Sequence, residues 1–329
     1  MSTRKILIIG AGPGGLMAAE EAARLGQEVL VLEKNQEYKR KVCAEAVTGK
    51  IMNEFPFVYD SVERAFPSAK VVSYQRTCYF RRRAPFLLTI NRHKLTDIQI
   101  SRAEHAGAKI QYGAKVEKID EHTVKTGNGE RFNYDVLIGA DGNRSIIRKH
   151  LKIPLVFYGL GLQYRIPVET DLPIFHLDPR RWGHTYAWVF PHKGYTSVGT
   201  GLSRVQPSRL FVRNLKDLCR ELSLPLTDVK LEADIINTDF RGYHFGNIWL
   251  VGESSGLISG LAGEGIYNAL VMGREVARQI VSGGSTSPAI QERLRKKHLH
   301  EMLIRSYYTW PGLVALFYRF APELKIFKE

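Results

Sequence analysis

The chain has 329 residues, 44% of them hydrophobic, and a formal net charge of +14 at pH 7. This length and apolar content support a sizeable core in one large or two moderate domains. No apolar run approaches the roughly 20 residues of a membrane-spanning helix, and no secretory signal precedes the first apolar segment. The three scattered cysteines lack metal-ligand spacing, so we expect no metal site, no disulfide framework and a reducing cytoplasm.

The positive charge predicts a surface that attracts anions such as nucleic acid, anionic lipid or a phosphorylated substrate. No helix-turn-helix, zinc-finger or RNA-binding signature is visible in the sequence, so we expect no nucleic-acid partner. A basic surface without a dedicated partner is the simplest alternative.

The first predicted element is a buried strand at Lys5–Ile9, and it runs into a turn with the spacing G-x-G-x-x-G. The first glycine allows a tight turn, the second lets backbone approach a pyrophosphate, and the third lets a helix pack on the strand. We expect that helix over residues 16–25, with free N–H groups at its start facing the pyrophosphate. The candidate cofactor residues of this turn are Gly10, Gly12, Pro13, Gly14 and Gly15.

A second predicted strand at Glu28–Leu32 ends at Glu33, at the distance where an acid accepts hydrogen bonds from a ribose. An acid at this place disfavours a 2′-phosphate, so the site suits FAD or NAD better than NADP. Lys34 follows as a further candidate cofactor residue. The alternative is a glycine-rich turn in an ordinary α/β domain, which the order of strand, turn, helix, strand and acid disfavours.

A polar loop over residues 40–47 comes next. Its Arg40 and Lys41 are candidates to meet the cofactor phosphates. Arg92, at the start of a helix predicted over 92–105, is a third candidate, with an exposed side chain as the alternative. We also expect strands within about 68–90, a strand from about 107, and a hairpin of 114–126 and 131–138 that closes near 127–129.

A second strand-to-turn segment, at residues 134–142, repeats the cofactor-binding pattern. It ends in Asp141 and Gly142, where an acid hydrogen-bonds cofactor hydroxyls and a glycine permits close backbone approach. Residues from about 155 to 245 are aromatic, strand-like and rich in proline, and we expect them to form a sheet that covers the substrate.

The chain then returns to the cofactor. A strand at 247–251 ends at a further glycine, and an amphipathic helix begins at residue 266. The turn before this helix aims N–H groups at the N1/O2 edge of a flavin, where reduced flavin is anionic. A nicotinamide needs only the first turn, so two distant glycine turns favour tightly bound FAD. The candidate residues here are Gly252, Glu253, Gly263, Gly265 and Ile266.

This ordered set of turns is similar to that of the hydroxylase-like FAD enzymes. Within them, three segments resemble the geranylgeranyl reductase family, and the resemblance covers about residues 1–280. Residues 41–46 (KVCAEA) resemble its K-x-C-G-[DE]-[GA] loop, residues 186–191 (YAWVFP) its Y-x-W-x-F-P motif, and residues 261–266 (LAGEGI) its L-T-G-E-G-I motif. The chain departs from the family at Glu253, where an Asp ordinarily bonds the ribityl chain, at Ala44, and in a short C-terminal region.

The resemblance implies an α/β fold with a Rossmann-like FAD-binding domain of the p-hydroxybenzoate-hydroxylase-like (GR2) type. An inserted, mostly antiparallel β-sheet forms the substrate domain, and a short helical region ends the chain. We expect the FAD-binding domain at 1–66, 93–150 and 245–285, the substrate domain at 67–92 and 151–244, and the C-terminal helical region at 286–329.

The activity that the resemblance implies is reduction of isoprenoid C=C bonds in a geranylgeranyl-type lipid, a prenyl chain or a quinone side chain. Hydride comes from flavin N5 together with a proton, and the reductant is NAD(P)H or ferredoxin. A nonpolar alkene requires an apolar tunnel. Candidate lining residues are Tyr186, Trp188, Phe190 and Pro191, with a plain sheet core as the alternative for the aromatic side chains.

Cys43 and Glu45 are the candidate catalytic residues. The resemblance places Cys43 beside flavin and substrate, where a protonated thiol donates a proton or orients the alkene; a small packing residue is the alternative. Glu45 is a candidate proton source, or a loop acid that pairs with Arg40 or Lys41. A flavin monooxygenase and a non-catalytic, flavin-binding, membrane-associated protein are the competing functions.

The tail combines basic residues over 291–305 with an aromatic segment over 307–320. This composition suits a helix at an anionic membrane surface, and a helical pair covering the cofactor domain is the alternative. We therefore expect a cytoplasmic protein, either free or peripheral on the inner face of the membrane.

Overall fold

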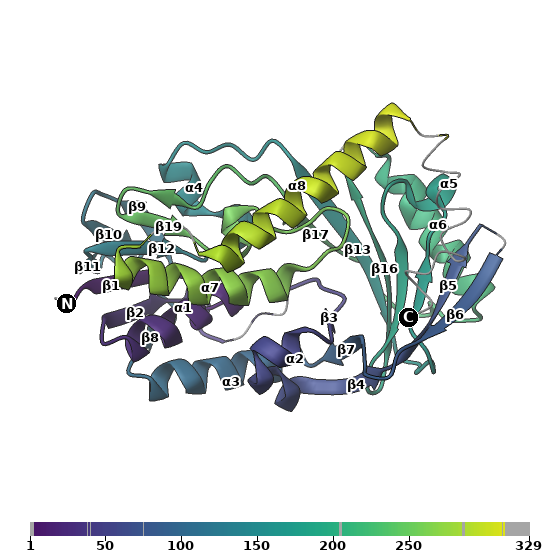
Figure 1. Ribbon diagram of the computed structural model, residues 1–329, viewed down its shortest axis with the longest axis horizontal. Helices are drawn as coiled ribbons and strands as arrows, with labels where there is room; N and C mark the ends of the chain where they lie inside the picture. Colours follow the sequence, from purple (N-terminus) through teal and green to yellow (C-terminus); the bar gives the residue numbers. More distant parts are fainter. Residues whose placement is uncertain are drawn as a thin grey trace.

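Two large sheets of different construction make up the two ends of the molecule (Figure 1). The computed structural model describes residues 3–37, 39, 41–74, 76–203, 206–284, 287–310 and 312. One end carries a six-stranded, mostly parallel sheet, and the other a seven-stranded, mostly antiparallel sheet. The predicted α/β architecture, with an antiparallel sheet inserted into a Rossmann-like chain, is confirmed.

The six-stranded sheet has the strand order β18-β19-β12-β1-β2-β8, and its strands run parallel except for the edge strand β18. The predicted strands at Lys5–Ile9 and Glu28–Leu32 are confirmed as β1 and β2, because runs of apolar residues suit a parallel sheet buried on both faces. The remaining strands are β8 (Lys109–Gln111), β12 (Val136–Gly139), β18 (His244–Phe245) and β19 (Ile248–Leu250).

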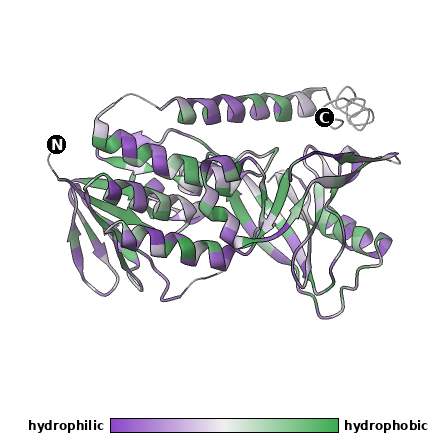
Figure 2. Cartoon of the chain, turned by 60° about the horizontal axis from the view of Figure 1, so that its bottom comes forward, coloured by the Kyte–Doolittle hydropathy of each residue, from purple (hydrophilic) through white to green (hydrophobic). Residues whose placement is uncertain are grey.

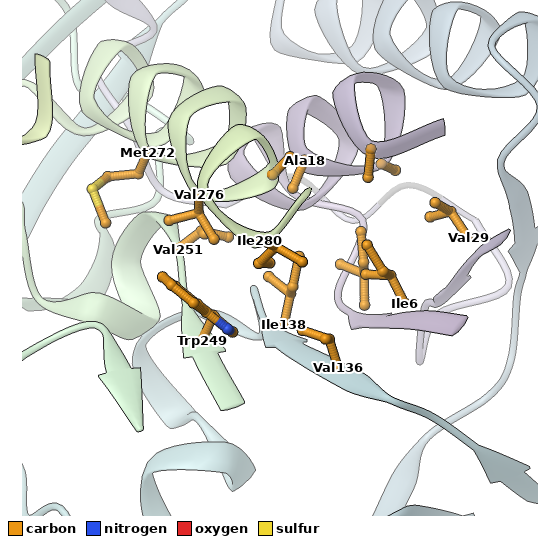
Figure 3. Close-up of a cluster of buried hydrophobic side chains, with 14 of the residues drawn as sticks. Ile6, Ala18, Val29, Val136, Ile138, Trp249, Val251, Met272, Val276 and Ile280 are labelled. Carbon is orange, nitrogen blue, oxygen red and sulfur yellow. The ribbon is translucent and has the colours of Figure 1, made fainter. Parts of the chain in front are cut away.

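Helices α1 (Pro13–Arg24) and α7 (Gly265–Ser282) pack together over one face of this sheet, and α3 (Arg92–His105) packs against α1 (Figure 1). The α3 bounds match the prediction, whereas α1 begins earlier because proline is tolerated in a first helical turn. Figure 3 shows the shared core, where Ala18 of α1 and Ile280 of α7 pack with Ile6 and Ile138 from the strands.

The opposite face is covered by a three-stranded sheet of β9 (Val116–Ile119), β10 (Thr123–Thr126) and β11 (Arg131–Asn133), with α4 at Ile146–His150. The predicted hairpin is confirmed at its turn, where Gly129 has a φ of +90°. The extent of its second strand is wrong: residues 136–139 leave it and join the large sheet as β12. The carboxylate of Asp135 accepts a 2.7 Å hydrogen bond from the Lys5 N–H and so ties the chain to β1.

The seven-stranded sheet has the order β17-β13-β16-β15-β14-β5-β6. One face packs on α5 (Pro179–Trp182) and α6 (Ser208–Glu221) through Trp182, Phe211 and Leu215. The strand bounds are β5 Ser68–Ser73, β6 Arg76–Arg81, β13 Tyr158–Ile166, β14 Ile174–His176, β15 Ala187–Pro191, β16 Thr196–Ser203 and β17 Glu232–Asn237.

A small sheet of β3 (Ala46–Thr48), β7 (Leu87–Ile90) and β4 (Val62–Phe66) lies between the two large ones. It joins strands from both sides of the domain boundary predicted after residue 66, and the domain boundaries stay a prediction. Short helical turns complete the fold: α2 at Ile51–Glu54, η1 at Pro56–Ser61, η2 at Gly142–Arg144 and η3 at Gly252–Ser255.

The last described helix, α8 (Pro288–Thr309), runs from α7 toward the seven-stranded sheet along the outside of the molecule (Figures 1 and 2). It confirms a helix in the predicted C-terminal region, while Pro311 and residues 313–329 of the aromatic tail lie outside the described residues. Within the described part of the chain, no helix is both long and apolar enough to span a membrane.

Candidate functional site

A cavity of about 1220 Å³ is lined by segments that follow strands of the six-stranded sheet and by strands of the seven-stranded sheet. Gly12 and Gly14 reach it from the first glycine turn, and Gly252 and Gly263 reach it from the turns near the other end of the chain. Ligand pockets commonly measure roughly 300–1,000 Å³, so this cavity has room for more than one small ligand. The two distant glycine turns are therefore parts of one site.

The first turn is shaped by backbone contacts that admit only glycine. A Cβ on Gly15 would lie 2.1 Å from the Gly10 carbonyl oxygen, so this position fixes the packing of the turn and does not line the cavity. Gly10 has a φ of +103° and likewise shapes the turn from outside the lining. A Cβ on Gly14 would lie 3.2 Å from the Gly252 nitrogen, so the two turns touch through bare backbone. Pro13 lines the cavity as the first residue of α1.

Glu33 stands at the cavity wall after β2. Its carboxylate accepts hydrogen bonds of 2.9 Å from the N–H of Ala11 and 2.9 Å from the N–H of Asn35. These two bonds hold the acid against the glycine turn with a face toward the cavity. Lys34 also lines the cavity and is exposed, whereas Arg40 lies outside the described residues.

Asp141 and Gly142 line the cavity at the end of β12. Asp141 Oδ2 accepts a 2.7 Å hydrogen bond from the Ile146 N–H at the start of α4. Its Oδ1 is buried and has no hydrogen-bond partner among the residues that the structure describes. Burial raises the pKa of Asp141, although hydrogen bonds from Ser145 and backbone N–H groups act in the opposite direction. A buried acceptor without a partner at a cavity wall fits a ligand hydroxyl.

Glu253 joins three segments around the cavity. Its carboxylate forms an ion pair with the Lys41 ammonium, and its Oε1 accepts a 3.1 Å hydrogen bond from the Asn237 N–H. The Glu253 carbonyl oxygen accepts a second bond, of 2.9 Å, from Asn237 Nδ2. Burial lowers the pKa of Lys41 to about 8. The family resemblance implies an aspartate at this position. Glutamate is longer by one methylene, and its carboxylate contacts Lys41.

The third turn leads into α7, whose first residues Gly265 and Ile266 line the cavity. Gly263 lies there with a φ of +68°. Lys50 forms a 2.7 Å ion pair with Glu264, and the Thr48 hydroxyl donates to Glu264 over 3.3 Å. This turn is thus tied to the segment that follows the Cys43 loop.

The two candidate catalytic residues have different surroundings. Cys43 is half-buried and lines the cavity, and its sulfur accepts a 3.3 Å hydrogen bond from the Glu45 N–H. Glu45 is buried outside the lining, with a φ of +52°, and accepts a 3.3 Å hydrogen bond from the Tyr195 hydroxyl. The alternative in which Lys41 is the partner of Glu45 finds no support, because Lys41 pairs with Glu253.

Strand alternation sends Tyr186, Trp188 and Phe190 to the cavity, while the residues between them face the core beneath the sheet. Phe175 completes this aromatic wall, with its ring centre 5.6 Å from that of Tyr186 and 5.2 Å from that of Phe190. Burial, with Glu264 nearby, raises the pKa of the Tyr186 hydroxyl to about 12. Pro191 does not line the cavity. Arg92 does, at the start of α3.

Sequence reasoning missed the contribution of α8 to this site. Lys297, Ile304 and Tyr308 of α8 line the cavity, and the Tyr308 hydroxyl lies 3.1 Å from His184 Nδ1. His184 is buried, and burial lowers its pKa to about 4. The intervals of seven and four residues between Lys297, Ile304 and Tyr308 place them on one helix face, but the sequence does not indicate what that face contacts.

Comparisons with known proteins indicate the family to which the chain belongs. The family model described as an FAD binding domain matches residues 3–166. The geranylgeranyl diphosphate reductase of Arabidopsis thaliana chloroplasts is 26% identical over 100% of this chain and 78% of its own length. Digeranylgeranylglycerophospholipid reductase 3 of Methanosphaera stadtmanae is 26% identical over 87% of this chain and 80% of its own length. The chain belongs to the geranylgeranyl reductase family of FAD-dependent oxidoreductases.

Solved structures agree on the fold of this family member. A geranylgeranyl bacteriochlorophyll reductase-like protein of Thermoplasma acidophilum superposes with a TM-score of 0.74 at 23% identity, over 92% of this chain and 88% of that one. A flavin-dependent brominase superposes with a TM-score of 0.72 at 14% identity, over 97% and 90%. The hydroxylase-like FAD-binding fold expected from the sequence is confirmed.

The residues present fit FAD. The two glycine turns present bare backbone to the cavity, and Gly14 approaches the Gly252 nitrogen closely enough to crowd any Cβ. Glu33 stands at the cavity wall beside the first turn, where the sequence predicts an acid that holds a ribose, and the buried Asp141 Oδ1 lacks a partner among the described residues. The exact role of each of these side chains toward FAD stays a prediction.

Proposed function

We propose that this protein reduces C=C bonds of an isoprenoid lipid or prenyl chain. The observation that carries the proposal is the aromatic wall of Phe175, Tyr186, Trp188 and Phe190, which borders the same cavity as the glycine turns. An isolated alkene offers no hydrogen-bonding groups, so recognition of it depends on apolar surface and the exclusion of water. The names of the relatives from Arabidopsis and Methanosphaera refer to geranylgeranyl compounds, which supports a substrate of this class.

The chain's own residues would hold the cofactor along its length. The first turn and the start of α1 offer N–H groups and a positive helix end to the pyrophosphate, with Lys41 and Arg92 at the same cavity. Glu33 would bind the ribose, and Asp141 a cofactor hydroxyl. The start of α7 would face the flavin edge that gains negative charge. When bound, reduced FAD supplies a hydride from N5 to one carbon of the alkene.

We assign the delivery of the proton in this reaction to Cys43. Its thiol borders the cavity, and a cysteine thiol is ordinarily protonated at neutral pH. A thiol alone is too weak an acid to protonate an unactivated alkene, so Cys43 would orient the alkene and deliver a proton to the adjacent carbon as the hydride arrives. Glu45 stays a second candidate, although its carboxylate lies outside the cavity lining.

An anaerobic half-reaction tests the proposal. The FAD-loaded protein is reduced with dithionite, excess reductant is removed, and a geranylgeranyl lipid or diphosphate is added while the flavin absorbance is followed. A reductase reoxidises its flavin without oxygen and returns a product heavier by two hydrogens per bond. A monooxygenase reoxidises only when oxygen is admitted, and a flavin-holding protein without activity leaves the flavin reduced on prenyl addition; either result contradicts the proposal.

We further propose that α8 brings the protein to an anionic membrane at the inner face of the bilayer. Leu299, Met302 and Leu303 are each about half exposed on its outer side, and Trp310 follows at its end. The basic residues Arg295, Lys296 and Arg305 are exposed on the same helix. Apolar side chains flanked by cations suit the headgroup boundary of anionic lipid. The inner side of α8 lines the cavity, so a lipid substrate would reach the cavity from the surface that α8 touches.

A further inference from the structure

A buried histidine stands behind the loop that carries Cys43. His192, the residue after the aromatic motif, has no exposed side-chain surface. Its Nδ1 lies 2.8 Å from Glu63 Oε2, and its Nε2 lies 3.0 Å from the Ala44 carbonyl oxygen. A carboxylate and a carbonyl only accept hydrogen bonds, so each ring nitrogen of His192 faces an acceptor. The ring therefore links Glu63 to the Ala44 carbonyl.

The local backbone brings these groups together from three separate segments. The pairing of β4 with β7 shifts register between Val62 and Arg64, and such a bulge re-aims the side chain of Glu63. A tight turn places His192, because its N–H donates to the Tyr195 carbonyl oxygen over 2.8 Å. The Thr89 hydroxyl donates to the Pro191 carbonyl oxygen over 2.9 Å and fixes the residue before the histidine.

The neighbouring charges hold the same loop. The Tyr195 ring stacks on His192 with 4.3 Å between ring centres, and its hydroxyl donates to Glu45. The Arg165 guanidinium lies 4.0 Å from the centre of the Tyr195 ring. Glu63, His192, Tyr195, Arg165 and Glu45 thus form one chain of contacts behind the loop. Glu45 sits at a positive φ that non-glycine residues seldom adopt, and such a backbone persists only where its surroundings determine it.

We propose that His192, oriented by Glu63, is the positioning residue of the Cys43 loop. Its Nε2–H binds the Ala44 carbonyl and so fixes the direction in which Cys43 faces the cavity. Glu63 holds the ring through Nδ1, and this contact keeps Nε2 aimed at the Ala44 carbonyl oxygen. The importance of this positioning for catalysis rests on the proposed function, because the proposed reaction gives Cys43 its role.

The test measures alkylation of each cysteine in FAD-saturated protein, at a pH where thiols are ionised, by mass spectrometry of the peptides. Cys78, on the edge strand β6, is the internal reference. His192→Phe keeps a ring against Tyr195 but removes both hydrogen bonds, and we expect Cys43 to react at least about fivefold faster relative to Cys78, as local opening exposes it. Glu63→Ala should also raise the alkylation rate of Cys43 relative to Cys78, because it removes the partner of His192 Nδ1. Glu63→Gln, whose amide still binds Nδ1, should match the native rate.

An unchanged Cys43 rate in folded His192→Phe overturns the proposal. Should that variant not fold, the two Glu63 variants decide: equal Cys43 rates overturn it, and a faster rate in Glu63→Ala alone supports it. Nitrogen-15 NMR of the ring should show a hydrogen on Nε2 in the native protein and in Glu63→Gln, and a native ring without a hydrogen on Nε2 contradicts the hydrogen bond to Ala44. None of these measurements uses a substrate, so a failed reductase assay leaves them standing.

Discussion

Replacing Gly273 with alanine should weaken FAD binding by about ten- to a hundredfold. A Cβ at this position would lie 2.3 Å from the Gly14 carbonyl oxygen and 3.0 Å from the Ala18 nitrogen. Nonbonded carbon contacts are ordinarily about 3.5–4.0 Å, so α7 must move roughly 1 Å away from α1. The first residues of both helices line the cavity, and the movement separates the two halves of the FAD site.

The magnitude follows from the cost of forcing the helices back together. Overpacking of a close contact costs about 1–3 kcal/mol, and each 1.4 kcal/mol is about tenfold in a dissociation constant. Alanine also favours a helix over glycine by about 1 kcal/mol, so the fold itself should lose little stability. The variant should therefore remain folded while losing affinity for FAD.

Titration of the apoprotein with FAD, followed by flavin fluorescence, gives the dissociation constants. Gly201→Ala is the matched control, because a Cβ on Gly201 would meet nothing within 4 Å and this glycine lines the same cavity. We expect the control to bind FAD as the native chain does. Native-like affinity in Gly273→Ala would refute the close approach of the two glycine turns as the basis of the site.

Three further predictions concern the chemistry, the pH dependence and the membrane. Cys43→Ala should keep bound FAD and lose most prenyl reduction in the anaerobic assay; full turnover removes Cys43 from the mechanism. FAD affinity should fall as pH rises through about 8, where Lys41 loses its charge, and Lys41→Met should bind weakly without this dependence. The lowered pKa also means that stability without FAD rises from about pH 8 to 10.5, since the unfolded chain then binds more protons; a flat profile contradicts it. Leu299→Glu should reduce co-sedimentation with anionic vesicles at low salt, whereas Tyr79→Glu, at an exposed site on β6, should not.

Local patterns were sufficient to predict the first half of the site. The strand before the first turn, the helix after it and the acid at Glu33 follow one another within a short segment, so periodicity and spacing specify them. The bounds of α3 were predicted for the same reason, since Asn91 caps this helix by accepting a 3.0 Å hydrogen bond from the Lys94 N–H.

The remaining features depend on partners far away in the sequence. Nothing local indicates that Glu253 pairs with Lys41, or that one face of α8 closes the cavity. The register shift that turns Glu63 toward His192 leaves no mark in the residues around it. The position of Asp141 at the cofactor site was predicted from the sequence. The hydrogen bond that its Oδ2 accepts from the Ile146 N–H at the start of α4 was not.

The binding stoichiometry of FAD tests the central claim most directly, because the claim is that turns from both ends of the chain form one cofactor site. Purified protein is titrated with FAD, and the bound flavin is measured from its absorbance after removal of free ligand. We predict one FAD per chain in native protein and markedly less retained FAD in Gly273→Ala. Colourless native protein after incubation with excess FAD would contradict the account.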